Sequence, residues 1–198
     1  MLAGATAVTH VPRDGVVPDD VVALMAASRI HHIPTLVVQS DLSEFFDHPN
    51  VVDSPLFRAM AADTIRAVYQ SGASQLDERA RNWIGRQRAG KADAFESVRR
   101  LHAAGVPMLV GSDAGNWGVV QGYSVHRELV RLVEAGLSPW EALAAGTTSA
   151  AAFLGRRFGV RPGDEAHFVV LDASPIEQIE NTQRIAFVIQ RGRVVFER

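Results

Sequence analysis

The chain has 198 residues, of which 47% are hydrophobic and 21% are charged, and its formal net charge is -2. These values are ordinary for a globular protein with a sizeable core, and the slight negative charge disfavours partners such as nucleic acid or an anionic membrane. Cysteine is absent, which excludes disulfides and thiolate metal ligands. The sequence has neither a bilayer-spanning apolar run nor the basic start of a secretory signal, so we expect a cytoplasmic protein that does not enter the membrane.

The beginning of the chain predicts two buried strands with a helix between them. Residues 5–8 are apolar and partly β-branched, which predicts a strand that ends just before His10. Residues 18–28 have an apolar stripe at helical spacing and predict a helix. Residues 31–38 predict the second buried strand.

Two adjacent histidines, His31 and His32, resemble a metal-binding pair. We expect them just ahead of the second strand, at the end of a parallel sheet or barrel that lies away from the chemistry. Neighbouring residues of a strand would also face opposite sides. A structural role is therefore favoured for both.

The middle of the chain predicts a long connection followed by helices. Residues 39–54 form a polar and aromatic stretch that is long for a loop after a strand, and long loops often serve as lids or binding loops. Residues 55–69, 75–88 and 91–104 predict helices. The arginines of these helices alternate with acidic residues, which favours a solvated face over a nucleic-acid site.

The most informative stretch runs from Met108 to Gly115. Three apolar residues lead into Gly-Ser-Asp-Ala-Gly, which predicts a short buried strand ending in a tight turn, with Asp113 at its carboxyl end. Helices predicted before and after this strand make it part of a βα unit, and such folds carry their chemistry at the carboxyl ends of strands. His10 has the same position relative to its own strand. Asp113 could also serve only as a turn residue.

The last part of the chain changes from helices to strands. Ser138, followed by Pro139 and Glu141, has the pattern of a helix start with a capping box. Strands are predicted for residues 166–171, 185–190 and 193–196, the last two forming a hairpin that needs further strands to be stable. We therefore expect two parts, residues 1–156 and residues 157–198.

Several motifs occur in the order seen in the amidohydrolase superfamily. They are Gly111-Ser-Asp-Ala-Gly115, His126-Arg-Glu-Leu, Glu134-Ala-Gly-Leu-Ser-Pro-Trp-Glu-Ala-Leu143, Arg161-Pro-Gly-Asp-Glu-Ala166 and Val188-Ile-Gln-Arg-Gly192. The chain most resembles the imidazolonepropionase-related, metal-dependent hydrolases of that superfamily. The resemblance implies an α/β fold: the C-terminal portion of a (β/α)8 TIM-type barrel, with about three barrel strands, plus a small C-terminal β segment of a composite β-sandwich.

The resemblance also implies a site and a reaction. Asp113 matches the eighth-strand metal ligand and general base, His10 matches the sixth-strand metal ligand, and His126 becomes a candidate substrate contact. The cofactor implied is a divalent metal, most often zinc, which makes hydroxide available at neutral pH while a nearby carboxylate transfers the proton. The implied activity is hydrolysis of a carbon–nitrogen bond in a non-peptide amide or cyclic amide of a small-molecule substrate.

The chain also departs from the family pattern. The His-x-His pair of the first strand, the Lys or Glu of the fourth and the His of the fifth are absent from the sequence. A full barrel needs about 250 residues, and a catalytic zinc usually has three protein ligands. We therefore expect the missing ligands on an N-terminal half, or a second copy of the chain as partner, because open strand edges favour association.

Two other hypotheses remain open at this stage. The chain could be a non-catalytic remnant that keeps part of the fold without the metal ligands of the N-terminal half. It could also be a complete small α/β enzyme or binding module that uses the glycine-rich loop after Asp113. The last hypothesis leaves the C-terminal strands unexplained.

Overall fold

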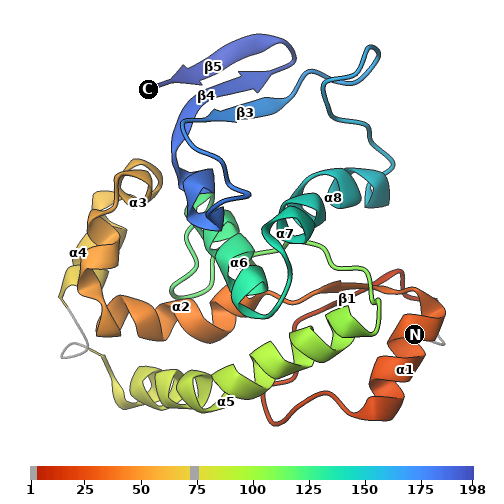
Figure 1. Ribbon diagram of the computed structural model, residues 1–198. Helices are drawn as coiled ribbons and strands as arrows, with labels where there is room; N and C mark the ends of the chain where they lie inside the picture. Colours follow the sequence, from red (N-terminus) through yellow and green to blue (C-terminus); the bar gives the residue numbers. More distant parts are fainter. Residues whose placement is uncertain (1–3, 72–75) are drawn as a thin grey trace.

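The computed structural model describes residues 4–71 and 76–198, except for the side chain of Leu42. Figure 1 shows the chain as helices around a few short strands, with a small sheet at the C-terminal end. The elements are β1 (Ala7–Thr9), α1 (Asp19–Ser28), β2 (His31–Ile33), α2 (Leu36–Asp47), α3 (Pro55–Met60), α4 (Asp63–Gln70), α5 (Glu78–Ala103), α6 (Tyr123–Glu134), α7 (Pro139–Gly146), α8 (Thr148–Phe153), β3 (Phe168–Leu171), β4 (Ile185–Gln190) and β5 (Arg193–Glu197). Two 3-10 segments, Pro49–Asp53 and Ile179–Gln183, are also present.

Three parallel strand segments lie side by side in chain order. β1 pairs with β2 in parallel, with Val8 opposite His32. The third segment follows α5: Met108 forms a parallel bridge with His32, and the Leu109 amide donates to the His32 carbonyl oxygen at 2.9 Å. Parallel neighbours joined by helical connections are the repeating unit of a (β/α) barrel. This arrangement has the strand number and direction that the sequence predicts.

The predicted second strand is too long. β2 ends at Ile33, and residues 36–47 form α2. Pro34 cannot donate to a strand ladder, and a short buried apolar run satisfies a helix as well as a strand. Residues 39–54 are therefore mostly helical and not an open loop. His31 and His32 also lie within β2 and not ahead of it, with His32 buried and His31 partly buried.

A single helix, α5, replaces the two helices predicted for residues 75–88 and 91–104. Gln75 lies outside the described residues, and α5 itself begins at Glu78. Gly90 sits inside the helix, where an added Cβ would approach the Arg13 carbonyl oxygen to 2.7 Å. The glycine therefore permits a close approach between α5 and the loop after β1, and it does not end the helix.

The single helix predicted for residues 55–69 is divided into α3 and α4, because Ala61 at the end of α3 has an extended backbone with φ of -98° and ψ of 129°. The other predicted helices are present. α1 occupies the range expected for it, α6 follows the Asp113 turn as expected, and α8 ends at Phe153, two residues before Gly155, whose φ is 66°. The capping box of α7 is formed: Ser138 accepts from the Glu141 amide, and the Glu141 carboxylate accepts from the Ser138 amide at 2.8 Å. The start of α7 depends on contacts between residues close together in the chain, which explains why the sequence predicts it well.

Apolar side chains form two main clusters. The larger cluster lies between the parallel strands and the helices around them. Its most buried members include Leu36, Ala94, Val98, Leu101, Leu132 and Ala142. The second cluster is aromatic and joins α2, α3 and α4 through Phe45, Phe57 and Tyr69, with the rings of Phe45 and Tyr69 stacked at 4.5 Å between centroids. Among the helices that the structure describes, none is long and apolar enough to cross a membrane.

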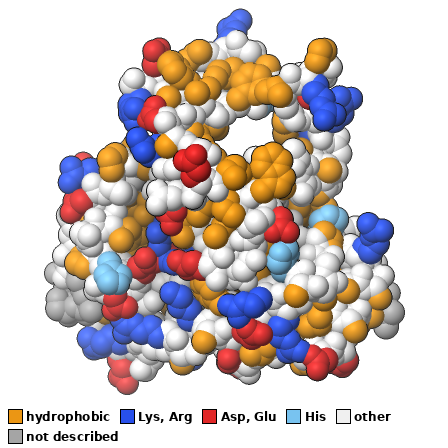
Figure 2. All heavy atoms as spheres, in the orientation of Figure 1, with side chains coloured by type: hydrophobic (Ala, Val, Ile, Leu, Met, Phe, Trp, Pro, Cys, Tyr) orange, Lys and Arg blue, Asp and Glu red, His pale blue; other side chains and the backbone are white. Residues whose placement is uncertain are grey.

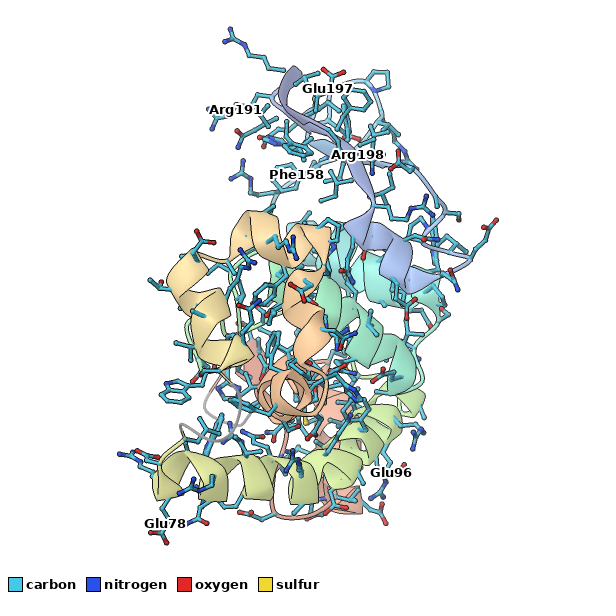
Figure 3. The ribbon with its side chains drawn as sticks, turned by 90° about the vertical axis from the view of Figure 1, so that its left-hand side faces the viewer. Glu78, Glu96, Phe158, Arg191, Glu197 and Arg198 are labelled. Carbon is cyan, nitrogen blue, oxygen red and sulfur yellow. The ribbon has the colours of Figure 1, made fainter. Side chains whose placement is uncertain are left out.

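The C-terminal strands form an antiparallel sheet in the order β3-β4-β5. Arg191 and Gly192 make the hairpin turn with φ of 50° and 75°, the signs that a type I′ turn requires. Figure 3 shows this sheet, with Arg191 and Glu197, at the opposite end of the molecule from α5. Apolar side chains gather over it in Figure 2, and the exposed ones include Val169, Val170, Val194, Val195 and Phe196.

Candidate active site

The carboxyl ends of the three parallel strands share an unusual backbone conformation. His10 follows β1, Thr35 follows β2 and Asp113 follows the third segment, and their φ angles are 69°, 54° and 52°. Positive φ is uncommon outside glycine and is strained for a β-branched residue such as threonine. Such strain concentrates at functional sites, where the surrounding structure holds it in place. The conformation therefore marks this edge of the sheet as a candidate site.

The His10 ring is oriented by Thr35. Nδ1 of His10 lies 2.8 Å from Oγ1 of Thr35, and that hydroxyl donates its only proton to the Pro34 carbonyl oxygen at 2.7 Å. The hydroxyl must therefore accept from His10, which places the ring proton on Nδ1. Nε2 is left with a free lone pair, which is the form of histidine that binds metals.

Asp113 lies opposite that free nitrogen. Its Oδ2 is 3.9 Å from Nε2 of His10, which is too long for a hydrogen bond, and the two side chains are 41% and 47% exposed. The Asn116 side-chain amide donates to Oδ2 of Asp113 at 2.7 Å and to its carbonyl oxygen at 3.2 Å. The structure thus brings together the two residues that the sequence singled out, with lone pairs available on both.

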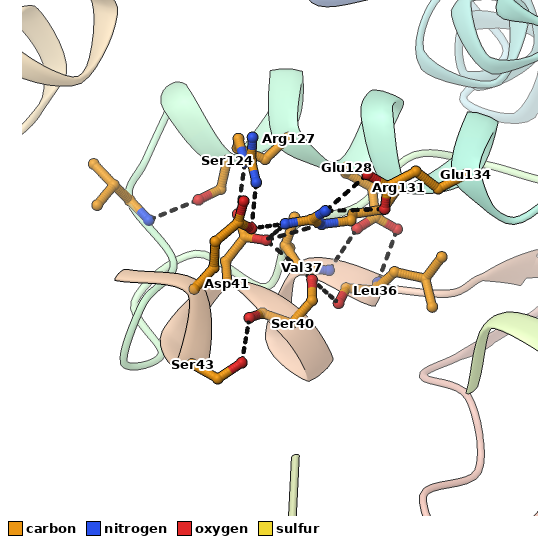
Figure 4. A network of polar contacts seen from close by, with 12 residues as sticks. Leu36, Val37, Ser40, Asp41, Ser43, Ser124, Arg127, Glu128, Arg131 and Glu134 are labelled. Atoms are coloured by element: carbon orange, nitrogen blue, oxygen red, sulfur yellow. Dashed lines mark hydrogen bonds and ion pairs between the residues drawn. The ribbon is translucent and has the colours of Figure 1, made fainter. Parts of the chain in front are cut away.

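A buried glutamate leaves the Thr35 hydroxyl free for His10. Thr35 is the N-cap residue of α2, a position whose side chain usually bonds to the first-turn amides. Here the Glu128 carboxylate of α6 accepts from the Leu36 and Val37 amides at 3.0 and 2.9 Å, as Figure 4 shows. Burial raises the pKa of Glu128 to about 8, while the two amides act in the opposite direction.

A charged network holds α2 against α6 beside this contact. Arg131 donates from Nη2 to Oδ1 of the buried Asp41 at 2.9 Å, and Arg127 donates from Nε to Oδ2 at 3.1 Å. Both arginines also pair with Glu44, and Arg131 bonds to Glu134 at 2.9 Å. Figure 4 shows the network spanning the two helices. It holds α2, whose N-cap residue is Thr35, against α6, which carries Glu128.

His126 is not joined to the other two candidates. It lies in the first half of α6 and is partly buried, and burial lowers its pKa. Within the described residues, its Nδ1 is buried without a hydrogen-bond partner. Its predicted contact with substrate therefore stays a prediction.

The donor set at the strand ends suits part of a metal site. Neutral imidazole nitrogen and carboxylate oxygen are both common zinc ligands. Over residues 4–71 and 76–198, however, no group of three or more His, Cys, Asp or Glu side chains could hold an ion together. His10 and Asp113 thus fit as two ligands, one fewer than catalytic zinc usually takes from protein.

Sequence reasoning missed three residues that shape this site, namely Thr35, Asn116 and Glu128. Asn116 has a local signal, because an Asn three residues after an Asp in a glycine-rich turn can bond back to it. Thr35 and Glu128 have none, since the Thr35 hydroxyl contacts His10 across 25 residues of sequence and the Glu128 carboxylate contacts the Leu36 amide across 92.

Comparison with known proteins supports the resemblance seen in the motifs. The sequence model of the amidohydrolase family matches residues 8–195. A Xaa-Pro dipeptidase with bound methionine in its active site has a similar structure, with a TM-score of 0.69 and 18% identity over 100% of this chain and 41% of that one. No curated protein matches the sequence significantly.

Two further structures have higher sequence identity. A putative prolidase from Bifidobacterium longum has a TM-score of 0.67 and 27% identity, covering 99% of this chain and 43% of that chain. A bottromycin amidohydrolase has a TM-score of 0.65 and 26% identity, covering 98% of this chain and 46% of that chain. The chain therefore spans less than half of each of these structures, and the predicted fold, part of a barrel plus a small C-terminal sheet, is confirmed.

Proposed function

Because this chain belongs to the amidohydrolase family, we propose that it carries part of the active site of a metal-dependent hydrolase of carbon–nitrogen bonds. The observation that carries the proposal is the meeting of His10 and Asp113, 3.9 Å apart at the carboxyl ends of two strands, with Nε2 of the histidine free. We assign residues 1–156 to the barrel part and residues 157–198 to the β segment. The substrate would be a small molecule with an amide or cyclic amide group.

His10 and Asp113 would hold a divalent metal, for which zinc is our first choice. A bound divalent metal would supply a Lewis acid that polarises the amide carbonyl and favours ionisation of water at neutral pH. Thr35 would keep His10 in the tautomer whose Nε2 can bind the metal. Asn116 would keep the Asp113 carboxylate turned towards the same metal. Second-layer contacts of this kind are worth a factor of about 10–100 in metal affinity.

Asp113 would also move the proton of the reaction. Its carboxylate would accept a proton from the water that attacks the carbonyl carbon, and would return it to the nitrogen as the carbon–nitrogen bond breaks. The products would be a carboxylic acid and an amine. His126 would contact the substrate if the start of α6 borders the site formed by His10 and Asp113.

The remaining ligands would come from outside the described residues. The chain spans 41–46% of the three similar structures described above, so an N-terminal half of the same enzyme, or a second copy of the chain, would have to supply them. The alternative is a non-catalytic remnant, in which the strand ends keep their geometry and no ion is bound.

Zinc titration of the purified chain separates these hypotheses. We expect zinc binding that weakens roughly tenfold or more in both His10→Ala and Asp113→Ala. His48→Ala, which removes an exposed histidine in the same chain, should have no effect. Binding that is unchanged in the first two variants, or absent from the unaltered chain, would contradict the proposal and favour the remnant.

A further inference from the structure

A pocket of about 550 Å³ lies beside the Asp113 loop. It is lined by Asp77, Arg79, Ala80, Trp83, Arg86, Asn116 and Trp117. Asn116 belongs both to this pocket and to the candidate site, because its amide holds the Asp113 carboxylate. The pocket therefore shares a wall with the place where the proposed chemistry would occur.

The position of α5 places the pocket on the reactive side of the strands. α5 has 26 residues, or about 39 Å of helix, whereas β1 and β2 have three residues each, about 10 Å. Its C-terminal part packs in the core through Val98 and Leu101 and leads into the third strand. Its N-terminal part, which starts at Glu78 in Figure 3, must therefore extend past the strand ends.

Two contacts confirm this placement. The loop after His10 reaches the N-terminal half of α5, because the Arg13 guanidinium lies 6.0 Å from the centre of the Trp83 ring. The loop after Asp113 is held by the buried Tyr69, whose hydroxyl oxygen accepts from the Gly118 amide at 2.6 Å. Both loops that carry candidate ligands are thus anchored next to the pocket.

The lining has a specific chemistry. Arg79, Trp83 and Arg86 are spaced at i, i+4 and i+7 and so share one face of α5. Trp117 adds a second indole, which is 59% exposed. Neither the Arg79 nor the Arg86 guanidinium forms an ion pair within the described part of the chain. Asp77 also lines the pocket, but its carboxylate caps α5 by accepting from the Ala80 amide at 2.7 Å.

From this lining we infer that the pocket binds a substrate group that combines an anion with a flat apolar part. Guanidinium groups bind carboxylate or phosphate through paired hydrogen bonds, and indole faces stack on flat apolar groups. The inference rests on the proposed function for the link to catalysis. It names the substrate class as small amides that carry an anionic group next to an aromatic or other flat moiety.

Binding can be measured without metal or turnover. In the presence of a chelator, tryptophan fluorescence of the Trp140→Phe variant would be followed, because this substitution removes the exposed indole outside the pocket. The probes are N-benzoylglycine, its neutral amide N-benzoylglycinamide, and phenyl phosphate. We expect a saturable change with N-benzoylglycine and at least tenfold weaker binding of the amide.

Variants of the two arginines provide the decisive comparison. Arg79→Gln together with Arg86→Gln should weaken N-benzoylglycine binding at least tenfold, whereas Arg81→Gln, on another face of the same helix, should leave it unchanged. Tighter binding of phenyl phosphate with the same arginine dependence would support the pocket and assign the anion as phosphate. Equal binding of acid and amide, or equal loss in the Arg81→Gln variant, would overturn the inference. Because the chelator removes metal from the binding assay, the inference about the pocket can fail or succeed independently of the zinc titration that tests the proposed function.

Discussion

Nδ1 of His10 lies 2.8 Å from Oγ1 of Thr35, a contact that connects the loop after β1 to the start of α2. The Thr35 hydroxyl gives its proton to the Pro34 carbonyl oxygen, so the direction of the bond from His10 is fixed. Because Nδ1 of His10 is bonded to Thr35, the other ring nitrogen, Nε2, faces Asp113. It therefore links the backbone conformation of Thr35 to the chemistry available at the strand ends.

Removing only this hydroxyl should disturb the histidine tautomer. Thr35→Val keeps the branched shape at φ of 54° but cannot accept a hydrogen bond. We expect mixed protonation of the His10 ring in the metal-free chain, seen in long-range proton–nitrogen NMR spectra, and zinc affinity lower by about 10–100-fold. Thr35→Ser, which retains the hydroxyl, should behave like the unaltered chain. An unchanged His10 tautomer in the valine variant would refute the role of Thr35.

Asn116 should matter for Asp113 in a comparable way. In Asn116→Ala the Asp113 carboxylate loses its 2.7 Å hydrogen bond and gains rotational freedom. Zinc affinity should fall by about 10–100-fold, while the free energy of unfolding should change by less than about 1 kcal/mol because the residue is exposed. Asn50→Ala serves as the exposed control. If zinc titration gave the same affinity for both variants, Asn116 would not position Asp113.

The sequence allowed the prediction of features that depend on short-range patterns. The capping box of Ser138 and Glu141 and the hairpin turn at Arg191 and Gly192 are each set by residues close together in the chain. The meeting of His10 and Asp113 was also predictable, because parallel strands end at one edge of a sheet.

Features that depend on distant packing were not predictable. Val37 and Val38 fit a buried strand as well as a buried helix, and the Glu128 carboxylate that accepts from the Leu36 amide at the start of α2 lies 92 residues away in the sequence. Gly90 has the appearance of a helix break, and only its contact with the Arg13 carbonyl shows why glycine is required there. Local propensity is a weak guide where tertiary contacts decide.

Replacing Glu128 should show how much the α2 start depends on it. Glu128→Leu leaves the buried Leu36 and Val37 amides without their acceptor, at a cost of about 1–3 kcal/mol for each unsatisfied group. Glu128→Gln retains one carbonyl oxygen and should cost less. Urea unfolding would give the two free energies. A leucine variant as stable as the glutamine variant would mean that the cap contributes little.

His32 should make the protein sensitive to acid. It is 2% exposed, and burial lowers its pKa from 6.5 to about 4, partly offset by the Val8 backbone. Between pH 6.5 and about 4, His32 therefore binds a proton in the unfolded chain but not in the folded chain. The contribution of His32 to stability is complete above about pH 6.5 and declines as the pH falls towards 4, by roughly 3 kcal/mol in total.

A comparison with His32→Leu isolates this contribution. The raised pKa of Glu128 acts in the opposite direction, stabilising the fold as the pH falls from about 8, but it is present in both proteins and cancels in the difference. Urea unfolding between pH 4 and 8 should therefore give a difference in free energy that changes with pH only below about 6.5. A constant difference across the range would show that His32 takes up its proton equally well in the folded chain, and that its burial does not control the acid limit of stability.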